Sequence, residues 1–171
     1  MKQVINKYMD EIKKENMRRS AVDKLNVNLY LLAILFTVFT FLIATNAQLL
    51  RDNNLLAFQL TAAIPLILSS IFARQRLACA SKREKEWHTY GFITFILAYG
   101  FLINSIGMMM AYMISVKVSM LFFLINIINP LTYSYMEIRD KEESFKSRFY
   151  KDAFFIGIII FLGVLPSLNG I

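Results

Sequence analysis

The sequence predicts an all-α integral membrane protein, a bundle of five transmembrane helices with its N-terminus in the cytoplasm. Three observations lead to this prediction: charge is scarce, it is absent from five long stretches, and the cationic residues gather in particular connectors. Of the 171 residues, 57% are hydrophobic and 18% are charged, whereas soluble domains have about 45–50% and about 25%. A soluble domain of this length would need polar helix faces to cover its surface.

Long charge-free stretches set the number of predicted helices. The stretches without Asp, Glu, Lys or Arg are residues 27–50, 55–73, 89–116, 118–136 and 153–171. Each is close to or above the roughly 20 apolar residues that cross a hydrocarbon core about 30 Å thick as a helix. We therefore expect five crossings.

The third and fourth crossings must be separated by a turn, because residues 89–136 are interrupted only by Lys117. A turn near Asn104 would leave the first leg too short. It would also place Lys117 near mid-membrane, at a cost of about 2.5–3.5 kcal/mol on insertion scales. We expect the turn around Ser115–Ser119, where the Lys117 amine reaches water. The predicted spans are 27–50, 55–73, 90–114, 118–136 and 153–171, with a tight turn at 51–54.

The positions of Lys and Arg predict the orientation. Of the 19 Lys and Arg residues, all except Arg51 and Lys117 precede the first span or lie in the second-to-third or fourth-to-fifth connector. Cytoplasmic loops of membrane proteins carry such an excess. The prediction is a multi-pass protein of the plasma or inner membrane with an external C-terminus. The polar first 26 residues lack the apolar core of a signal peptide, so the first span is expected to be an uncleaved signal anchor.

Both ends of the chain leave two interpretations open. Residues 1–26 form a basic cytoplasmic segment ahead of the transmembrane domain 27–171. An apolar stripe at helical spacing suggests an amphipathic helix on the lipid surface, and a solvated extension is the alternative; the stripe consists of Val4, Ile5, Tyr8, Met9 and Ile12. At the other end, Pro166 shortens the last uninterrupted helix. The alternative there is four spans followed by an interfacial C-terminal helix.

Amides and hydroxyls are the polar groups inside the predicted spans. Asn126, Asn129 and Tyr133 stand at i, i+3 and i+7 and therefore share one helix face. Pro130 removes a backbone donor and should free the Asn126 carbonyl. We weigh a polar intramembrane site here, with Asn104 added from the third span, against simple interhelical hydrogen bonds worth about 0.6 kcal/mol each. Asn104 and Gln59 are also expected to take part in this interhelical packing.

Small residues recur at steps of three and four on two spans. We expect these faces to pack helices closely, either within the chain, which we favour for the first hairpin, or between copies. The residues are Ala33, Thr37, Thr40 and Ala44 on the first span, and Gly107, Ala111 and Ser115 at the end of the third.

These features rank three functions. The leading hypothesis is a non-enzymatic membrane protein that acts through helix–helix assembly, with itself or with a partner membrane protein. The first alternative is a small-molecule transporter or pore subunit that uses the polar face of the fourth span. The second is a membrane-embedded thiol enzyme using Cys79 and His88.

Several classes of function are not expected. No ionisable residue lies inside a predicted span, which argues against an ion-coupled transporter acting alone and against a metal or other cofactor. The orientation rule already accounts for the net charge of +7, so no nucleic-acid partner is expected. The charged connector Glu137–Asp152 is a candidate for partner contact or a solvated loop.

Overall fold

The computed structural model describes residues 2–79, 83–139 and 145–169, and all of its regular structure is helical. Five of its helices are long and apolar enough to cross a membrane, counting the last three elements as one rod. The predicted all-helical class is therefore confirmed. The elements are α1 (Lys2–Asp52), α2 (Asn54–Ala78), α3 (Glu84–Met113), α4 (Val116–Arg139), α5 (Phe145–Ile159), the π-helical turn η1 (Ile160–Val164) and α6 (Leu165–Leu168).

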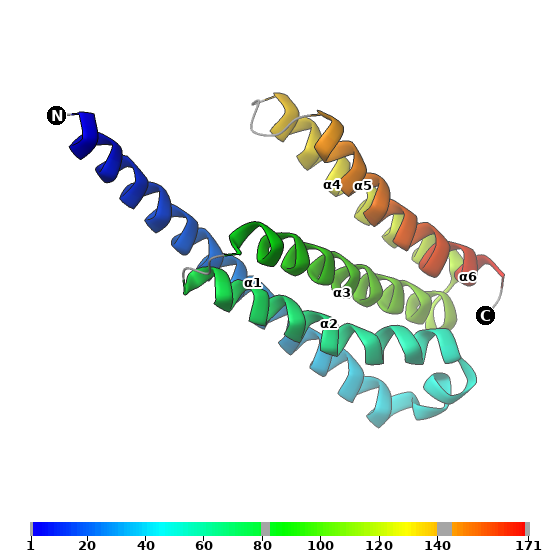
Figure 1. The fold of residues 1–171 in the computed structure, drawn as a ribbon. Helices are drawn as coiled ribbons and strands as arrows, with labels where there is room; N and C mark the ends of the chain where they lie inside the picture. Colours follow the sequence, from blue (N-terminus) through cyan, green and yellow to red (C-terminus); the bar gives the residue numbers. More distant parts are fainter. Residues whose placement is uncertain (1, 80–82, 140–144, 170–171) are drawn as a thin grey trace.

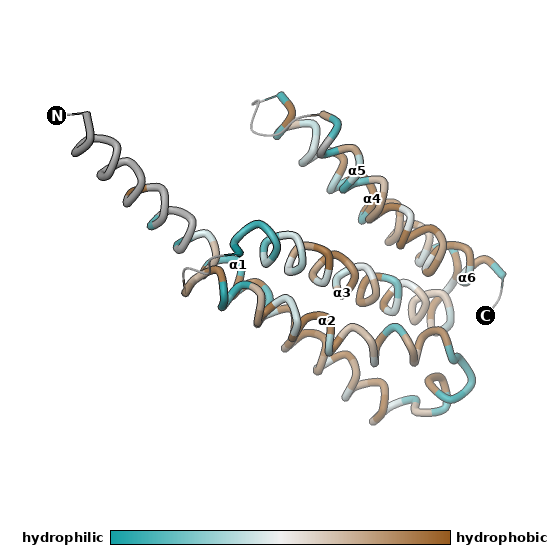
Figure 2. The backbone as a smooth tube through the Cα atoms, viewed as in Figure 1, coloured by the Kyte–Doolittle hydropathy of each residue, from teal (hydrophilic) through white to brown (hydrophobic). Residues whose placement is uncertain are grey.

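Helix α3 lies at the centre of the bundle. In the most apolar 18-residue segment of each helix, 56% of the residues are buried in α3, against 17% in α1 and 11% in α4. Helices α1, α2 and α3 pack as one layer, with α2 in the middle (Figure 1). Helices α4 and α5 form a second pair, which meets α3 near the α3–α4 turn and diverges from it toward the beginning of α3 (Figure 1). Hydrophilic residues concentrate at the helix ends (Figure 2).

Helices α1 and α2 pack along a seam whose buried residues recur every seven positions. The buried residues of α1 recur at every seventh position, and those of α2 include a matching series. A period of seven keeps one seam facing the partner when two helices supercoil in the left-handed sense. The two series are Ala21, Asn28, Leu35, Leu42 and Leu49 on α1, and Leu56, Ala63 and Ser70 on α2.

The small residues of the first span lie on the opposite side of α1 from this seam. Ala33, Thr37, Thr40 and Ala44 are all exposed. They therefore do not pack the hairpin, contrary to the arrangement that we favoured from the sequence. Leucines at heptad spacing supply more contact area than this stripe. The Thr37 hydroxyl is satisfied within α1, since Thr37 Oγ1 donates to the Ala33 carbonyl over 2.9 Å.

Polar side chains set the helix ends near both short turns. Asn53 separates α1 from α2, and its Oδ1 accepts from the Leu56 N–H over 2.9 Å. Asn46 interrupts α1 with φ −153° and ψ 62°. At the α3–α4 turn, Ser115 Oγ accepts from the Val118 N–H over 3.3 Å. The turn therefore lies at the start of the expected range, and Lys117 is exposed in the first turn of α4.

Helix α1 runs without interruption through residue 26, where the sequence suggested a boundary between a cytoplasmic segment and the first span. Residues 13–25 contain no Gly or Pro and are rich in good helix formers, so the helix has no reason to end there. Its N-terminal turns extend past the other helices (Figure 1). Of the proposed apolar stripe, the Ile12 side chain is described and is exposed; the other four side chains lie outside the described set.

The last rod continues past Pro166 instead of ending before it. Proline has no N–H to donate to the carbonyl four residues earlier, which is that of Leu162. Gln59 of α2 supplies the missing donor, with its Nε2 2.8 Å from the Leu162 carbonyl oxygen. Asn104 of α3 makes a similar bond, from Nδ2 to the Ile158 carbonyl oxygen over 3.1 Å. Residues 170 and 171 of the predicted span lie outside the described residues.

Phe123 of α4 is the wedge that holds α3, α4 and η1 together. Its ring is 1% exposed and fits between two glycines, Gly107 of α3 and Gly163 of η1. A Cβ added at Gly107 would overlap the Phe123 ring, and one at Gly163 would lie 2.8 Å from Phe123 Cε1. Ser119 adds a polar tie beside the wedge, since its Oγ donates to the Gly107 carbonyl over 2.8 Å.

We predict that Gly107→Ala destabilises the bundle by about 1–3 kcal/mol, the range for overpacking a filled core. Gly157→Ala is the matched control, because a Cβ at Gly157 meets nothing within 4 Å and alanine is the better helix former by up to about 1 kcal/mol. Thermal unfolding in detergent, followed by circular dichroism, should show a lower Tm for the first variant only. Equal melting of the two variants would contradict the wedge.

Candidate binding groove

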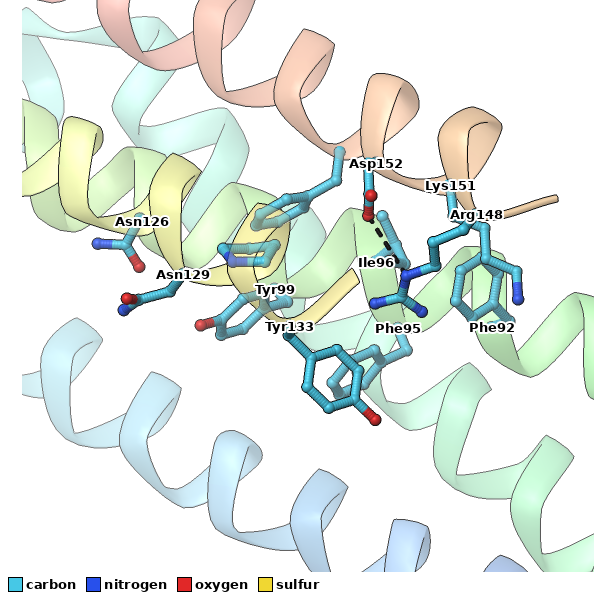
Figure 3. A pocket seen from close by; sticks show the side chains of 12 residues that line it. Phe92, Phe95, Ile96, Tyr99, Asn126, Asn129, Tyr133, Arg148, Lys151 and Asp152 are labelled. Atoms are coloured by element: carbon cyan, nitrogen blue, oxygen red, sulfur yellow. Dashed lines mark ion pairs between the residues drawn. The ribbon is translucent and has the colours of Figure 1, made fainter. Parts of the chain in front are cut away.

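A groove of about 390 Å³ lies between α3 and the α4–α5 pair. Its volume falls within the roughly 300–1,000 Å³ of small-molecule sites. Aromatic rings form its floor: Phe95 stacks on Tyr99 at 6.0 Å between ring centroids, and Tyr99 stacks on Phe155 of α5 at 5.7 Å. Phe92 and Ile96 complete the apolar lining (Figure 3). An apolar chain would find a continuous contact surface here.

The polar face predicted on the fourth span forms one wall of this groove. Asn126, Asn129 and Tyr133 all line it, together with Pro130. Asn126 Nδ2 donates to the Phe122 carbonyl of its own helix over 2.9 Å. Asn129 and Tyr133 are exposed, so the groove is open along α4. The structure thus brings three of the four predicted site residues together.

Asn104, the fourth predicted site residue, lies elsewhere. It is fully buried and does not line the groove, and its Nδ2 donates to the Ile158 carbonyl of α5. Its Oδ1 has no hydrogen-bond partner among the described residues, and neither has Gln59 Oε1. These two amides hold the last rod against α2 and α3, which is the packing role expected for Gln59.

Arg148 contacts four other side chains at the charged end of the groove. Its Nε donates to Ser134 Oγ over 2.6 Å, and a terminal nitrogen lies 2.9 Å from Glu137 Oε2. Asp152 approaches Arg148 Nε at 3.7 Å, and the Tyr133 ring centroid lies 5.1 Å from its Cζ. The side chains of Arg148, Glu137 and Asp152 are 15%, 18% and 13% exposed. Such sheltered, multiply bonded charges hold α4 to α5 more firmly than a surface pair would.

Further cations gather where the groove ends, near the beginning of α3. Lys151 Nζ of α5 lies 5.3 Å from the centroid of the Phe92 ring. Lys24 of α1 is within electrostatic range of Lys151, of Arg74 on α2 and of Glu137 on α4. We call this group of charged residues the charged mouth. Arg148, Lys151 and Asp152 line the groove, and Lys24, Arg74 and Glu137 lie beside them. Figure 3 shows the amides at one end of the groove and the charges at the other.

The helices that carry Lys24 and Arg74 are tied together next to this mouth. Asn28 of α1 is 2% exposed, and its Nδ2 donates to Ser70 Oγ over 2.9 Å. Ser70 Oγ in turn donates to the Gly91 carbonyl of α3 over 2.9 Å. A single chain of hydrogen bonds therefore fixes α1, α2 and α3 at the edge of the groove.

The other residues singled out from the sequence lie away from the groove. Gly107 is buried against Phe123, while Ala111 and Ser115 are half-buried near the α3–α4 turn. Cys79 is exposed at the end of α2, and His88 is exposed in α3. Among the described residues, no three His, Cys, Asp or Glu side chains gather as they would around a metal ion.

Sequence reasoning missed the charged mouth because it treated residues 137–152 as a loop. The structure begins α5 at Phe145, which puts Arg148, Lys151 and Asp152 on a helix. The spacing of four between Arg148 and Asp152 was the available signal. Residues 140–144 of the predicted connector lie outside the described residues.

Comparison with other proteins finds no relative with which this groove could be compared. No protein-family model, curated protein or solved structure matches the chain. Support for a function comes instead from the groove, with its aromatic floor, amide wall and charged mouth.

Proposed function

We propose that this chain is a non-enzymatic membrane protein that binds an amphiphilic molecule in the groove between α3 and α4–α5. The observation that carries the proposal is the order of surfaces along the groove. Stacked aromatic rings from α3 and α5 lie along its floor, and charged side chains gather at its mouth. A molecule with an apolar chain and a polar head matches that order.

The proposal includes five crossings, with the N-terminus and the charged mouth at the cytoplasmic face. The distribution of Lys and Arg supports this orientation. The groove would then open into the cytoplasmic half of the bilayer, where amphiphiles are concentrated. The polar groups that line the groove are two amides, two phenols and three charged side chains, and Cys79 and His88 do not line it. Binding without covalent chemistry is the simpler function for such a lining.

Filling the groove should weaken binding. Asn129→Trp would place an indole in the open part of the groove, and Ile128→Trp is the matched control because Ile128 is exposed on α4 and does not line the groove. We expect Asn129→Trp to need about tenfold more phospholipid for half-occupancy, since losing about 1.4 kcal/mol of apolar contact has that effect. Native mass spectrometry of the delipidated protein, titrated with phospholipid, would count the bound molecules. Equal occupancy in both variants would refute groove binding.

A second candidate function is assembly of two copies through α1. The observation that favours it is the exposed stripe of Ala33, Thr37, Thr40 and Ala44, on a helix whose buried seam faces the other way. Small residues on a lipid-facing surface let two helix backbones approach closely. Because both copies would present the same stripe, the contact would be a symmetric pair.

Cysteine cross-linking tests this assembly. In a Cys79→Ser background, Thr40→Cys should form disulfide-linked dimers in native membranes under mild oxidation. Phe41→Cys is the control, since Phe41 is also exposed but is rotated by about 100° around α1. Dimer formation that is equal for the two positions, or absent from both, would exclude a specific contact through this stripe.

A further inference from the structure

Arg74 is a buried cation without a counter-charge among the described residues. It is 5% exposed, and its guanidinium lies against α3 where Gly91 has no side chain: a Cβ there would sit 3.7 Å from both Arg74 Cζ and Nε. Its Nε is enclosed and has no hydrogen-bond partner in the part of the chain that the structure describes. A buried charge is costly unless it is paired and hydrogen-bonded. The position therefore calls for an anion that comes from outside the chain.

Neighbouring charges increase that requirement. Lys24 and Arg74 each lie one helical turn from a partner of the Asn28–Ser70 hydrogen bond, and Lys24 is within electrostatic range of Arg74, so two cations from different helices are close to each other. Glu137 also acts on Lys24, but Glu137 Oε2 already lies 2.9 Å from Arg148. Across the charged mouth, four cations (Lys24, Arg74, Arg148 and Lys151) share two carboxylates (Glu137 and Asp152), so positive charge is in excess.

Arg74 lies beside the groove without lining it: it contacts α3 at Gly91, one residue before Phe92. Phe92, next to Gly91 in the chain, lines the groove and carries Lys151 over its ring. A molecule with its anionic group at Arg74 can therefore extend its apolar part along Phe92 toward Phe95 and Tyr99.

We infer that Arg74 and Lys24 bind the phosphate of an anionic phospholipid whose acyl chain lies in the groove. The inference rests on the proposed function and names its ligand. A guanidinium offers two parallel N–H donors that match phosphate oxygens, and the cytoplasmic leaflet is rich in anionic lipids.

The charged mouth also selects between kinds of phospholipid. The headgroup of phosphatidylcholine carries a quaternary ammonium, which would need a carboxylate or an open aromatic face nearby. The Tyr133 and Phe92 rings beside the mouth already face Arg148 and Lys151. The two carboxylates at the mouth, Glu137 and Asp152, both lie against Arg148, at 2.9 and 3.7 Å. Phosphatidylglycerol, which has no cation in its headgroup, fits this set of charges, and phosphatidylcholine does not.

The test compares two arginines of one helix. Arg74→Gln removes the buried cation, and Arg76→Gln removes an exposed one from the last turn of α2. Full-length protein is delipidated in mild detergent and titrated with phosphatidylglycerol or phosphatidylcholine, and bound lipid is counted by native mass spectrometry. We expect Arg74→Gln to need at least about tenfold more phosphatidylglycerol for half-occupancy, since a charge-assisted hydrogen bond has that effect. Arg76→Gln should match the unmodified chain.

Further arms separate the outcomes. Unchanged phosphatidylglycerol binding by Arg74→Gln, with phosphatidylcholine bound equally well, would overturn the inference but leave the groove standing if Asn129→Trp still weakens both lipids. If the unmodified chain binds neither phosphatidylglycerol nor phosphatidylcholine, both the proposed function and this inference are wrong. Inorganic phosphate that raises the Tm as much as phosphatidylglycerol would overturn the lipid assignment.

A second variant covers the case in which Arg74→Gln does not fold. Arg74→Lys keeps the positive charge but lacks the two parallel N–H donors of the guanidinium, so it should bind phosphatidylglycerol with intermediate affinity. Full affinity would count against the phosphate contact.

Discussion

The architecture depends on one backbone carbonyl that has lost its donor. Pro166 leaves the Leu162 oxygen without the N–H that a regular helix would supply, and inside a bilayer there is no water to replace it. Gln59 of α2 reaches across and donates over 2.8 Å. Asn104 of α3 makes the parallel bond to Ile158. A proline that would end the helix in another setting is thereby accommodated, and the last rod stays whole through Leu168.

These bonds determine where the groove lies. They hold the last rod to α2 and α3 at the level of η1, and the Phe123 wedge holds α4 to the same point. Toward the other end, the polar contacts lie within two separate groups of helices. Hydrogen bonds of Asn28, Ser70 and Gly91 join α1, α2 and α3 into one half, and Arg148 joins α5 to α4 in the other half. The two halves meet at one end and diverge toward the other (Figure 1). The side chains that line the groove come from both halves.

Much of the helical order could be predicted from the sequence, because length without charge is a direct signal of a helix that can cross a membrane. The turn near Ser115 followed from the cost of burying Lys117. The shared face of Asn126, Asn129 and Tyr133 followed from helical periodicity, and all three line the groove. Local rules suffice for such features because each depends on a single helix.

What could not be predicted depends on contacts between helices far apart in the chain. The bond from Gln59 to Leu162 spans 103 positions, and nothing local in either segment indicates it. The burial of Arg74 likewise depends on the close approach of α2 to α3, where a Cβ at Gly91 would lie 2.8 Å from Ala73 Cβ. The seven-residue spacing of the buried α1 residues is present in the sequence. The prediction for α1 was based instead on the small residues at steps of three and four, which lie on the opposite face of the helix.

In the proposed topology the last rod crosses the membrane, which would explain why the Leu162 carbonyl needs Gln59, and the charged mouth lies at the cytoplasmic face. The most direct measurement is a pair of reporters fused after Ile171, alkaline phosphatase and a green fluorescent protein. Five crossings with a cytoplasmic N-terminus predict active phosphatase and no fluorescence. Bright fluorescence with inactive phosphatase would place both termini on one side and contradict the fifth crossing.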